Sequence, residues 1–231
     1  LDLKPDPTGL QIAGNLLDEP YDLVLTPDHL LVTVGHYPNT DQGSLVRFPL
    51  ASFGGVNEGE TYPVSDYFSG GTFSAGVQAL APGRREGIFL QPHPSGRLLV
   101  GVFANNLQST SWTTPSEVLV VDPSDLSKPP ASIDLAPIDP PCIGAWQLEA
   151  LDDDVTKVAV ACDGSETVAV MNFPPSFGSG SLADDAASVT TCGLNLGGGI
   201  NLWATQFVAR DGDGGFLAVQ AQLGRSPRLW H

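Results

Sequence analysis

A repeat of four similar units constrains the fold of this chain more than any other feature of its sequence. Each unit has an apolar strand, a short polar turn and a strongly apolar second strand, and a third strand follows after a polar gap. The second strands cover residues 30–34, 98–102, 158–162 and 216–220. A long period of this kind is typical of repeat architectures.

The second strands also set the spacing of the units. If Leu31, Leu99, Val158 and Leu217 are equivalent, the units are 68, 59 and 59 residues apart. We predict that these four side chains are buried at equivalent places.

The segments within each unit have the composition of antiparallel β-strands. Apolar and β-branched runs alternate with turns rich in Pro, Asp, Ser and Gly, which is the pattern of strands joined by hairpins. Third strands are predicted at 44–48, 117–121 and 167–171, and weaker fourth strands at 131–135 and 188–192. Long helical periodicity is missing from the sequence, and residues 184–187 are expected to form one helical turn at most.

The second strands are apolar on both faces, as expected where one sheet packs between two others. Radially stacked blades of four antiparallel strands create this condition in every unit, whereas a sandwich has no fixed long period. We therefore predict an all-β fold, a β-propeller with about four blades in this chain. The units span approximately residues 21–53, 87–135, 145–193 and 202–231, and insertions at 54–82 and 107–115 enlarge them.

The order of segments resembles the YVTN/lactonase-like β-propeller superfamily. The resemblance rests on the strand 98–102, the Pro-Ser-Gly turn before it and the strand-like segment 118–122. The Tyr-Val-Thr-Asn tetrapeptide itself is absent, and residues 31–34 and 102–105 only approach it. The resemblance implies a propeller fold. In lactonase-type members it implies a central channel in which carboxylate, Asn and His side chains hold a divalent cation, and this cation polarises a carbonyl and activates water.

The sequence leaves two ways to complete such a propeller. The segment 1–20, and residues 10–14 in particular, could supply the outer strand of the last blade, so that four blades close as they stand. Alternatively, the four units belong to a larger propeller of about six to eight blades. We favour the second arrangement, because His231 directly follows a strand-like segment.

The charge of the chain excludes several classes of partner. Ten Lys and Arg residues oppose 26 Asp and Glu residues, which gives a formal net charge of −16. Such a surface repels nucleic acid and anionic lipid headgroups. No stretch approaches the roughly 20 apolar residues of a transmembrane helix. The turn chemistry and the scarcity of Lys favour an exported protein (periplasmic, at the cell surface or secreted), with a lipoprotein as one form, whose signal peptide was removed.

Three cysteines lie within residues 142–192, at spacings that fit neither CxxC redox chemistry nor a zinc ribbon. In an antiparallel hairpin, the start of the first strand meets the end of the second. We therefore predict that Cys142 and Cys162 approach each other as a disulfide pair. Cys192 is expected to remain a free thiol.

The polar residues that follow the second strands are the best candidates for chemistry. If the units are blades, His36, Asp41, Asn105 and Asp163 lie on one rim, where they could hold a cation such as calcium. The Asp-rich turns at residues 152–154 and 211–215 are interpreted as ordinary hairpin turns. His29 and His93 are predicted at the opposite end from His36, which disperses the histidines. No catalytic residue and no cofactor are therefore assigned.

Two functions remain open at this point. The first is a non-catalytic exported scaffold or interaction module that presents loops to a protein partner. The alternative is a divalent-cation-dependent, lactonase-like hydrolase that uses the central channel. They differ in whether three or more carboxylate, Asn or His side chains converge on one point.

Overall fold

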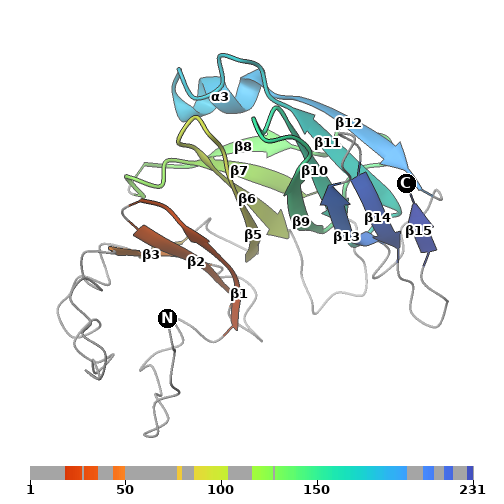
Figure 1. The fold of residues 1–231 in the computed structure, drawn as a ribbon, viewed down its shortest axis with the longest axis horizontal. Helices are drawn as coiled ribbons and strands as arrows, with labels where there is room; N and C mark the ends of the chain where they lie inside the picture. The colour runs from red at the N-terminus through yellow and green to blue at the C-terminus, as the bar shows by residue number, and fades with distance from the viewer. Residues whose placement is uncertain are drawn as a thin grey trace, which may run out of the picture.

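The computed structural model of the chain describes residues 19–27, 29–35, 44–49, 77–79, 86–103, 116–126, 128–196, 205–210, 216–220 and 228–230. Within these residues the fold is all-β apart from one short helix, α3 (Leu182–Ser188). The strands form four antiparallel sheets, and in each sheet the strands lie side by side in chain order (Figure 1). The prediction of an all-β chain built from antiparallel sheets is therefore confirmed.

The first sheet contains β1 (Glu19–Leu25), β2 (His29–Gly35), β3 (Ser44–Pro49) and β4 (Val77–Ala79). The second contains β5 (Glu86–Pro92), β6 (Leu98–Phe103), β7 (Glu117–Val121) and β8 (Ala131–Asp134). The third contains β9 (Ala145–Ala150), β10 (Lys157–Cys162), β11 (Thr167–Asn172) and β12 (Thr190–Asn195). The fourth contains β13 (Thr205–Arg210), β14 (Phe216–Gln220) and β15 (Arg228–Trp230).

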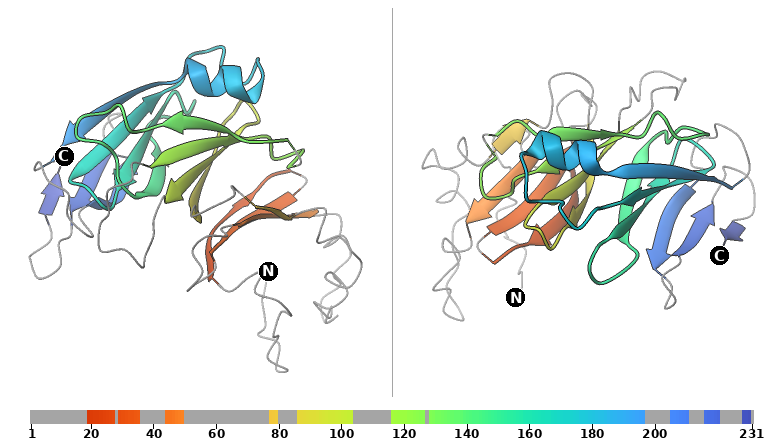
Figure 2. Two further views of the ribbon diagram at one scale, coloured as in Figure 1. Left: turned by 180° about the vertical axis from the view of Figure 1, so that it is seen from behind. Right: turned by 90° about the horizontal axis from the view of Figure 1, so that it is seen from above.

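The four sheets pack face to face, in chain order, as a curved row (Figures 1 and 2). The first strands of consecutive sheets contact one another, β1 with β5, β5 with β9 and β9 with β13. The second strand of each sheet also contacts the first strand of the next. The first and fourth sheets lie at opposite ends of the row.

Three apolar layers lie between the sheets. Leu31 and Leu45 pack with Leu90 between the first and second sheets. Leu99 and Leu148 belong to the layer between the second and third sheets, and a smaller layer joins the third sheet to the fourth. The prediction that the second strands are apolar on both faces is thus correct for β6, because its alternating side chains contribute to two layers.

The predicted alignment of the repeat units is shifted by one residue at the third unit. Leu31, Leu99 and Val158 are all fully buried. However, Leu31 and Leu99 face the following sheet, whereas Val158 faces the preceding one. A shift of one residue along a strand reverses the face, so Ala159, which packs toward the fourth sheet, is the true equivalent. The side chain of Leu217 lies outside the described residues.

Some predicted boundaries differ from the observed strands. Residues 54–82 were expected to be an insertion, but residues 77–79 of this segment form β4. Residues 19–20 open β1, although they were assigned to a possible closing segment. The rest of that segment and the insertion 107–115 lie outside the described residues. None of the helices that the structure describes is long and apolar enough to cross a membrane.

Helix α3 is longer than the single turn expected from the sequence. Ser181 accepts a hydrogen bond from the backbone N–H of Asp184, and the Asp184 side chain binds back to Ser181, which forms a capping box. The helix lies over β7 and β8. The signal for this helix was therefore its N-terminal cap rather than its apolar pattern.

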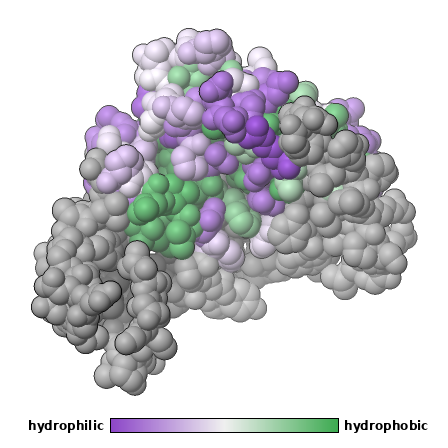
Figure 3. All heavy atoms as spheres, in the orientation of Figure 1, coloured by the Kyte–Doolittle hydropathy of each residue, from purple (hydrophilic) through white to green (hydrophobic). Residues whose placement is uncertain are grey.

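One face of the first sheet carries large apolar side chains that are not covered. Leu23 is 64% exposed and Leu25 is 68% exposed, both in β1. Their neighbour Val24 points the other way and packs against the layer shared with the second sheet. In Figure 3, hydrophobic surface gathers over the first sheet. Because side chains alternate along a strand, Leu23 and Leu25 belong to the face that points away from the second sheet.

Candidate functional site

The predicted rim residues follow strand ends that lie at the same edge of each sheet. Gly35 pairs with Glu19, Phe103 with Glu86, and Cys162 lies opposite Ala145. The second strand of each of these three sheets therefore ends where its first strand begins. Of the candidates that follow these ends, the structure describes Asp163, whereas His36, Asp41 and Asn105 lie outside the described residues.

Asp163 opens the turn between β10 and β11, and the segment before β9 holds this turn in place. The Asp163 N–H donates to the carbonyl of Gly144 over 2.7 Å, and the Gly164 N–H donates to that of Ile143 over 2.8 Å. Gly144 has a φ of 68°, a conformation that side chains other than Gly rarely adopt. The turn and this segment form one local structure.

A disulfide joins the same two segments. It links Cys142 to Cys162, with their Cα atoms 5.1 Å apart, and both residues are buried. Cys192 in β12 is a free, exposed thiol. These are the pair and the free cysteine that the hairpin argument predicted.

The carboxyl group of Asp163 is the unusual feature of this region. The residue is fully buried, and within the described ranges neither carboxylate oxygen has a hydrogen-bond partner. Burial raises the pKa of Asp163 from an ordinary value of 3.8 to about 7. Buried polar groups normally have partners. A carboxyl held near its midpoint at neutral pH is therefore a candidate for proton transfer, for a bound ion or for a bound water.

The other buried polar side chains here serve the backbone. The Ser116 hydroxyl accepts from the Ala145 N–H over 2.9 Å, and the Ser165 hydroxyl accepts from the Ile143 N–H over 3.2 Å. These hydroxyls fasten the start of β9 to neighbouring turns. The unpartnered oxygens of Asp163 are not explained in this way.

The described residues do not by themselves make a calcium site. Calcium takes about six to eight oxygen ligands. Among the residues that the structure describes, no three His, Cys, Asp or Glu side chains converge, and Asp163 supplies a single carboxyl group.

The two described histidines have structural surroundings. His93 Nδ1 lies 2.8 Å from the Ser95 hydroxyl, and its ring packs against Phe177 at 4.6 Å and Phe173 at 5.2 Å between ring centroids. Burial lowers the pKa of His93. The backbone N–H of His29 donates to the Thr26 hydroxyl in the turn before β2. Neither arrangement resembles a metal ligand.

The Asp-rich turn at 152–154 is also structural. Asp152 accepts from both the N–H and the hydroxyl of Thr156, each over 2.7 Å. The neighbouring Asp153 binds Arg210 of the fourth sheet. The turn 211–215 lies outside the described residues.

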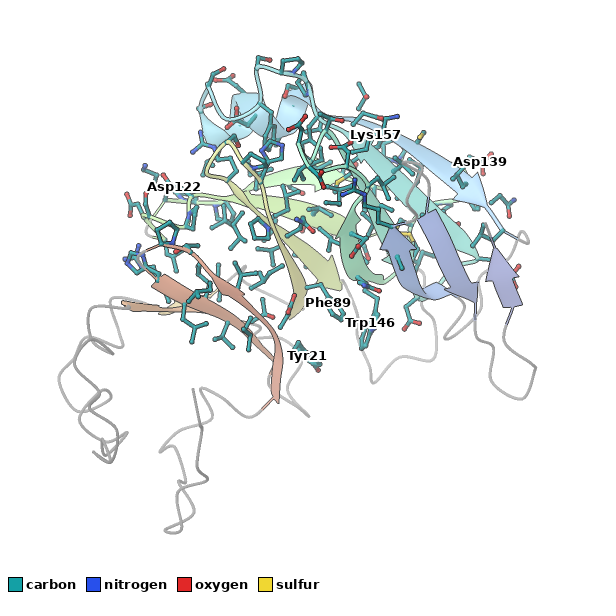
Figure 4. The ribbon with its side chains drawn as sticks, viewed as in Figure 1. Tyr21, Phe89, Asp122, Asp139, Trp146 and Lys157 are labelled. Carbon is teal, nitrogen blue, oxygen red and sulfur yellow. A yellow bond between two sulfur atoms is a disulfide. The ribbon has the colours of Figure 1, made fainter. Side chains whose placement is uncertain are left out.

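Polar side chains link each sheet to the next. Arg47 of β3 donates to the carbonyls of Pro123 and Ser124 beside the second sheet. Arg97, before β6, lies 2.7 Å from the buried carboxylate of Asp185 in α3. Three aromatic rings from consecutive first strands, Tyr21, Phe89 and Trp146, pack edge to face (Figure 4).

The comparisons with known proteins assign no family. No family model matches the chain, and no curated protein matches its sequence significantly.

Proposed function

We propose that this chain is a non-catalytic, exported interaction module whose sheets are blades of a β-propeller larger than four blades. The observation that carries the interaction function is the uncovered apolar face of the first sheet, with Leu23 and Leu25. Contiguous exposed apolar surface on a soluble protein marks a site of association. Burying one leucine side chain contributes about 1.5–3 kcal/mol.

The propeller assignment is supported by how the sheets stack. Each sheet is made of consecutive strands, and first strands meet first strands along the row. Blades arranged around an axis have this order, with their first strands innermost. The row is curved and its two ends lie apart in both views (Figures 1 and 2), which favours a ring with more than four blades.

Export is supported by the disulfide. Disulfides form and persist in oxidising compartments and are rare where cellular reductants keep thiols reduced. Cys142 and Cys162 are joined in the protein interior, between β10 and the segment before β9. We therefore propose a periplasmic, cell-surface or secreted location, and a protein as the partner.

A second candidate function rests on Asp163. A buried carboxyl with a pKa of about 7 and no hydrogen-bond partner in the described structure is what a cation-dependent, lactonase-like hydrolase would use as a ligand or a proton carrier. This candidate requires further ligands to meet at Asp163.

One experiment separates the two functions. Purified protein is titrated with calcium, magnesium and zinc in a calorimeter and then assayed for turnover of a panel of lactones and esters. The interaction module predicts no turnover and no tight stoichiometric binding. Tight binding and turnover that are both lost in Asp163→Ala, and kept in the control Asp154→Ala in an exposed turn, would establish the hydrolase instead.

A further inference from the structure

Four residues hold the same position in the first strands of the four sheets. Each pairs with an equivalent residue of the second strand just after an irregularity in the ladder, on the face that points toward the preceding sheet in the second, third and fourth sheets. Opposite them on the second strands are Val32, Val100, Val160 and Ala218. We call Leu23, Leu90, Leu148 and Val208 the junction residues.

The junction residues differ sharply in exposure. Leu90, Leu148 and Val208 are 6%, 5% and 1% exposed, because a preceding sheet covers each of them. Leu23 occupies the same position in the first sheet and is 64% exposed. In the first sheet, the junction residue is therefore exposed, whereas in the other three sheets a preceding sheet covers it.

The existing junctions show contacts that cover such a residue. Between the second and third sheets, Gly101 leaves room for Leu148, since a Cβ on Gly101 would lie 2.5 Å from Leu148 Cδ1. At two other junctions, a polar side chain of the covering first strand binds the backbone N–H of the junction residue. Asp22 Oδ2 accepts from Leu90 over 2.9 Å, and Gln147 Oε1 accepts from Val208 over 3.2 Å.

The face of the fourth sheet that points away from the third sheet is equivalent in position to the faces that cover the other junction residues. Ala209 follows Val208 in β13, so it points away from the third sheet, as Val24 of β1 points toward the second. Ala209 is exposed. Within the described residues, the row therefore has an exposed junction residue, Leu23, on the first sheet, and an exposed residue, Ala209, on the outward face of the fourth sheet.

We infer that a second copy of this chain docks head to tail on the Leu23 face, with its fourth sheet covering the first sheet. The inference deepens the proposed function, because it names the partner of the interaction module. Two copies related by a two-fold axis would form two such junctions. Head-to-tail contacts that close produce a ring, here of eight sheets when the four described sheets of each copy are counted, within the range known for propellers.

The first test is the mass in solution. Sedimentation velocity between about 1 and 100 µM should show a dimer whose dissociation constant rises at least tenfold in Leu23→Lys, because a buried, unpaired ammonium group opposes docking. Leu194→Lys is the matched control, since Leu194 of β12 is also an exposed leucine, and it should leave the constant unchanged. A chain that stays monomeric over this range, or a dimer that tolerates Leu23→Lys, overturns the inference.

The second test is the geometry of docking. In a Cys192→Ser background, Leu23→Cys and Ala209→Cys in the same chain should be joined between copies by a short bis-maleimide, and the product should stop at the covalent dimer. A ladder of longer products, or no product, overturns the closed ring. Turnover in the lactone assay would refute the proposed function whatever the mass. A monomer without turnover would refute only the second copy as its partner.

Discussion

The first and third sheets have the same strand order but very different surroundings. The third sheet packs between two neighbours, and a disulfide and two buried hydroxyls hold the start of its first strand. The first sheet has a described neighbour on one side, and its other face exposes Leu23 and Leu25. Equivalent leucines of one repeat can therefore stabilise the fold in one sheet and remain available for docking in another.

Shortening the equivalent leucines should give the largest difference between the two sheets. Leu148→Ala should lower the free energy of unfolding by about 3–4 kcal/mol, because it removes buried methyl groups and leaves a cavity between two sheets. Leu23→Ala should change it by less than about 0.5 kcal/mol. Urea unfolding followed by tryptophan fluorescence, at a concentration where the chain is monomeric, measures both. Equal losses for the two variants would contradict the comparison.

The disulfide should have the next largest effect. Cys142 and Cys162 are 20 residues apart, and a cross-link closing a loop of that length contributes about 3 kcal/mol by restricting the unfolded chain. The double variant Cys142→Ser, Cys162→Ser should therefore unfold at lower urea concentration. Cys192→Ser is the control and should leave the midpoint unchanged. If the double variant were as stable as the wild type, the disulfide would not stabilise the third sheet.

Asp163 should make the third sheet sensitive to pH. Its pKa of about 7 in the folded state lies above its ordinary value of 3.8. The folded state thus binds more protons than the unfolded state between these values, and stability falls as the pH rises from about 4 to about 7. Asp163→Asn does not titrate. The free energy of unfolding of this variant at pH 8 should exceed that of the wild type by about 2 kcal/mol. This value is roughly half of the maximum that the pKa shift allows, because the buried amide also lacks hydrogen-bond partners.

Urea unfolding of Asp163→Asn and the wild type at pH 5 and pH 8 measures this difference. Asp154→Asn, in an exposed turn, serves as the control and should show no growing difference. A gap between Asp163→Asn and the wild type that did not widen with pH would show that the carboxyl is ionised without penalty in the folded protein.

The smallest effect is expected at the junction of the third and fourth sheets. Arg210 and Asp153 lie 2.5 Å apart, but both side chains are exposed. Solvent screens such pairs, and many contribute nothing measurable. Arg210→Ala should therefore leave the unfolding midpoint within error, and added salt should not change this result. A clear shift would mean that the pair helps to hold the fourth sheet in place.

The sequence was informative wherever one residue type fixes one structure. Apolar runs bounded by turn residues located the strands, and hairpin pairing brought Cys142 to Cys162. The face of Val158 was not predictable in the same way. Residues 158–162 are apolar throughout, so their pattern does not distinguish the two faces of a strand buried on both sides.

The candidate site was harder to predict from the sequence. Asp163 stood among several rim residues, and its lack of a partner depends on which backbone groups surround it. The junction residues were missed because a bulge precedes each of them, and a bulge adds a residue that shifts the alternation. Helix α3 was underestimated because its capping box uses Asp184, whereas the usual signal is Glu or Gln.

The chain-order arrangement of the sheets also determines when each one can be completed during synthesis. A chain leaves the ribosome from its N-terminus, and its early parts begin to fold first. Leu31 and Leu45 of the first sheet are covered by β5 and β6, so they wait in contact with solvent until those strands emerge. The third sheet meets a finished neighbour as soon as it appears. Among the described sheets, the first is thus the one that emerges before any described neighbour is in place, and we expect it to gain the most from a chaperone.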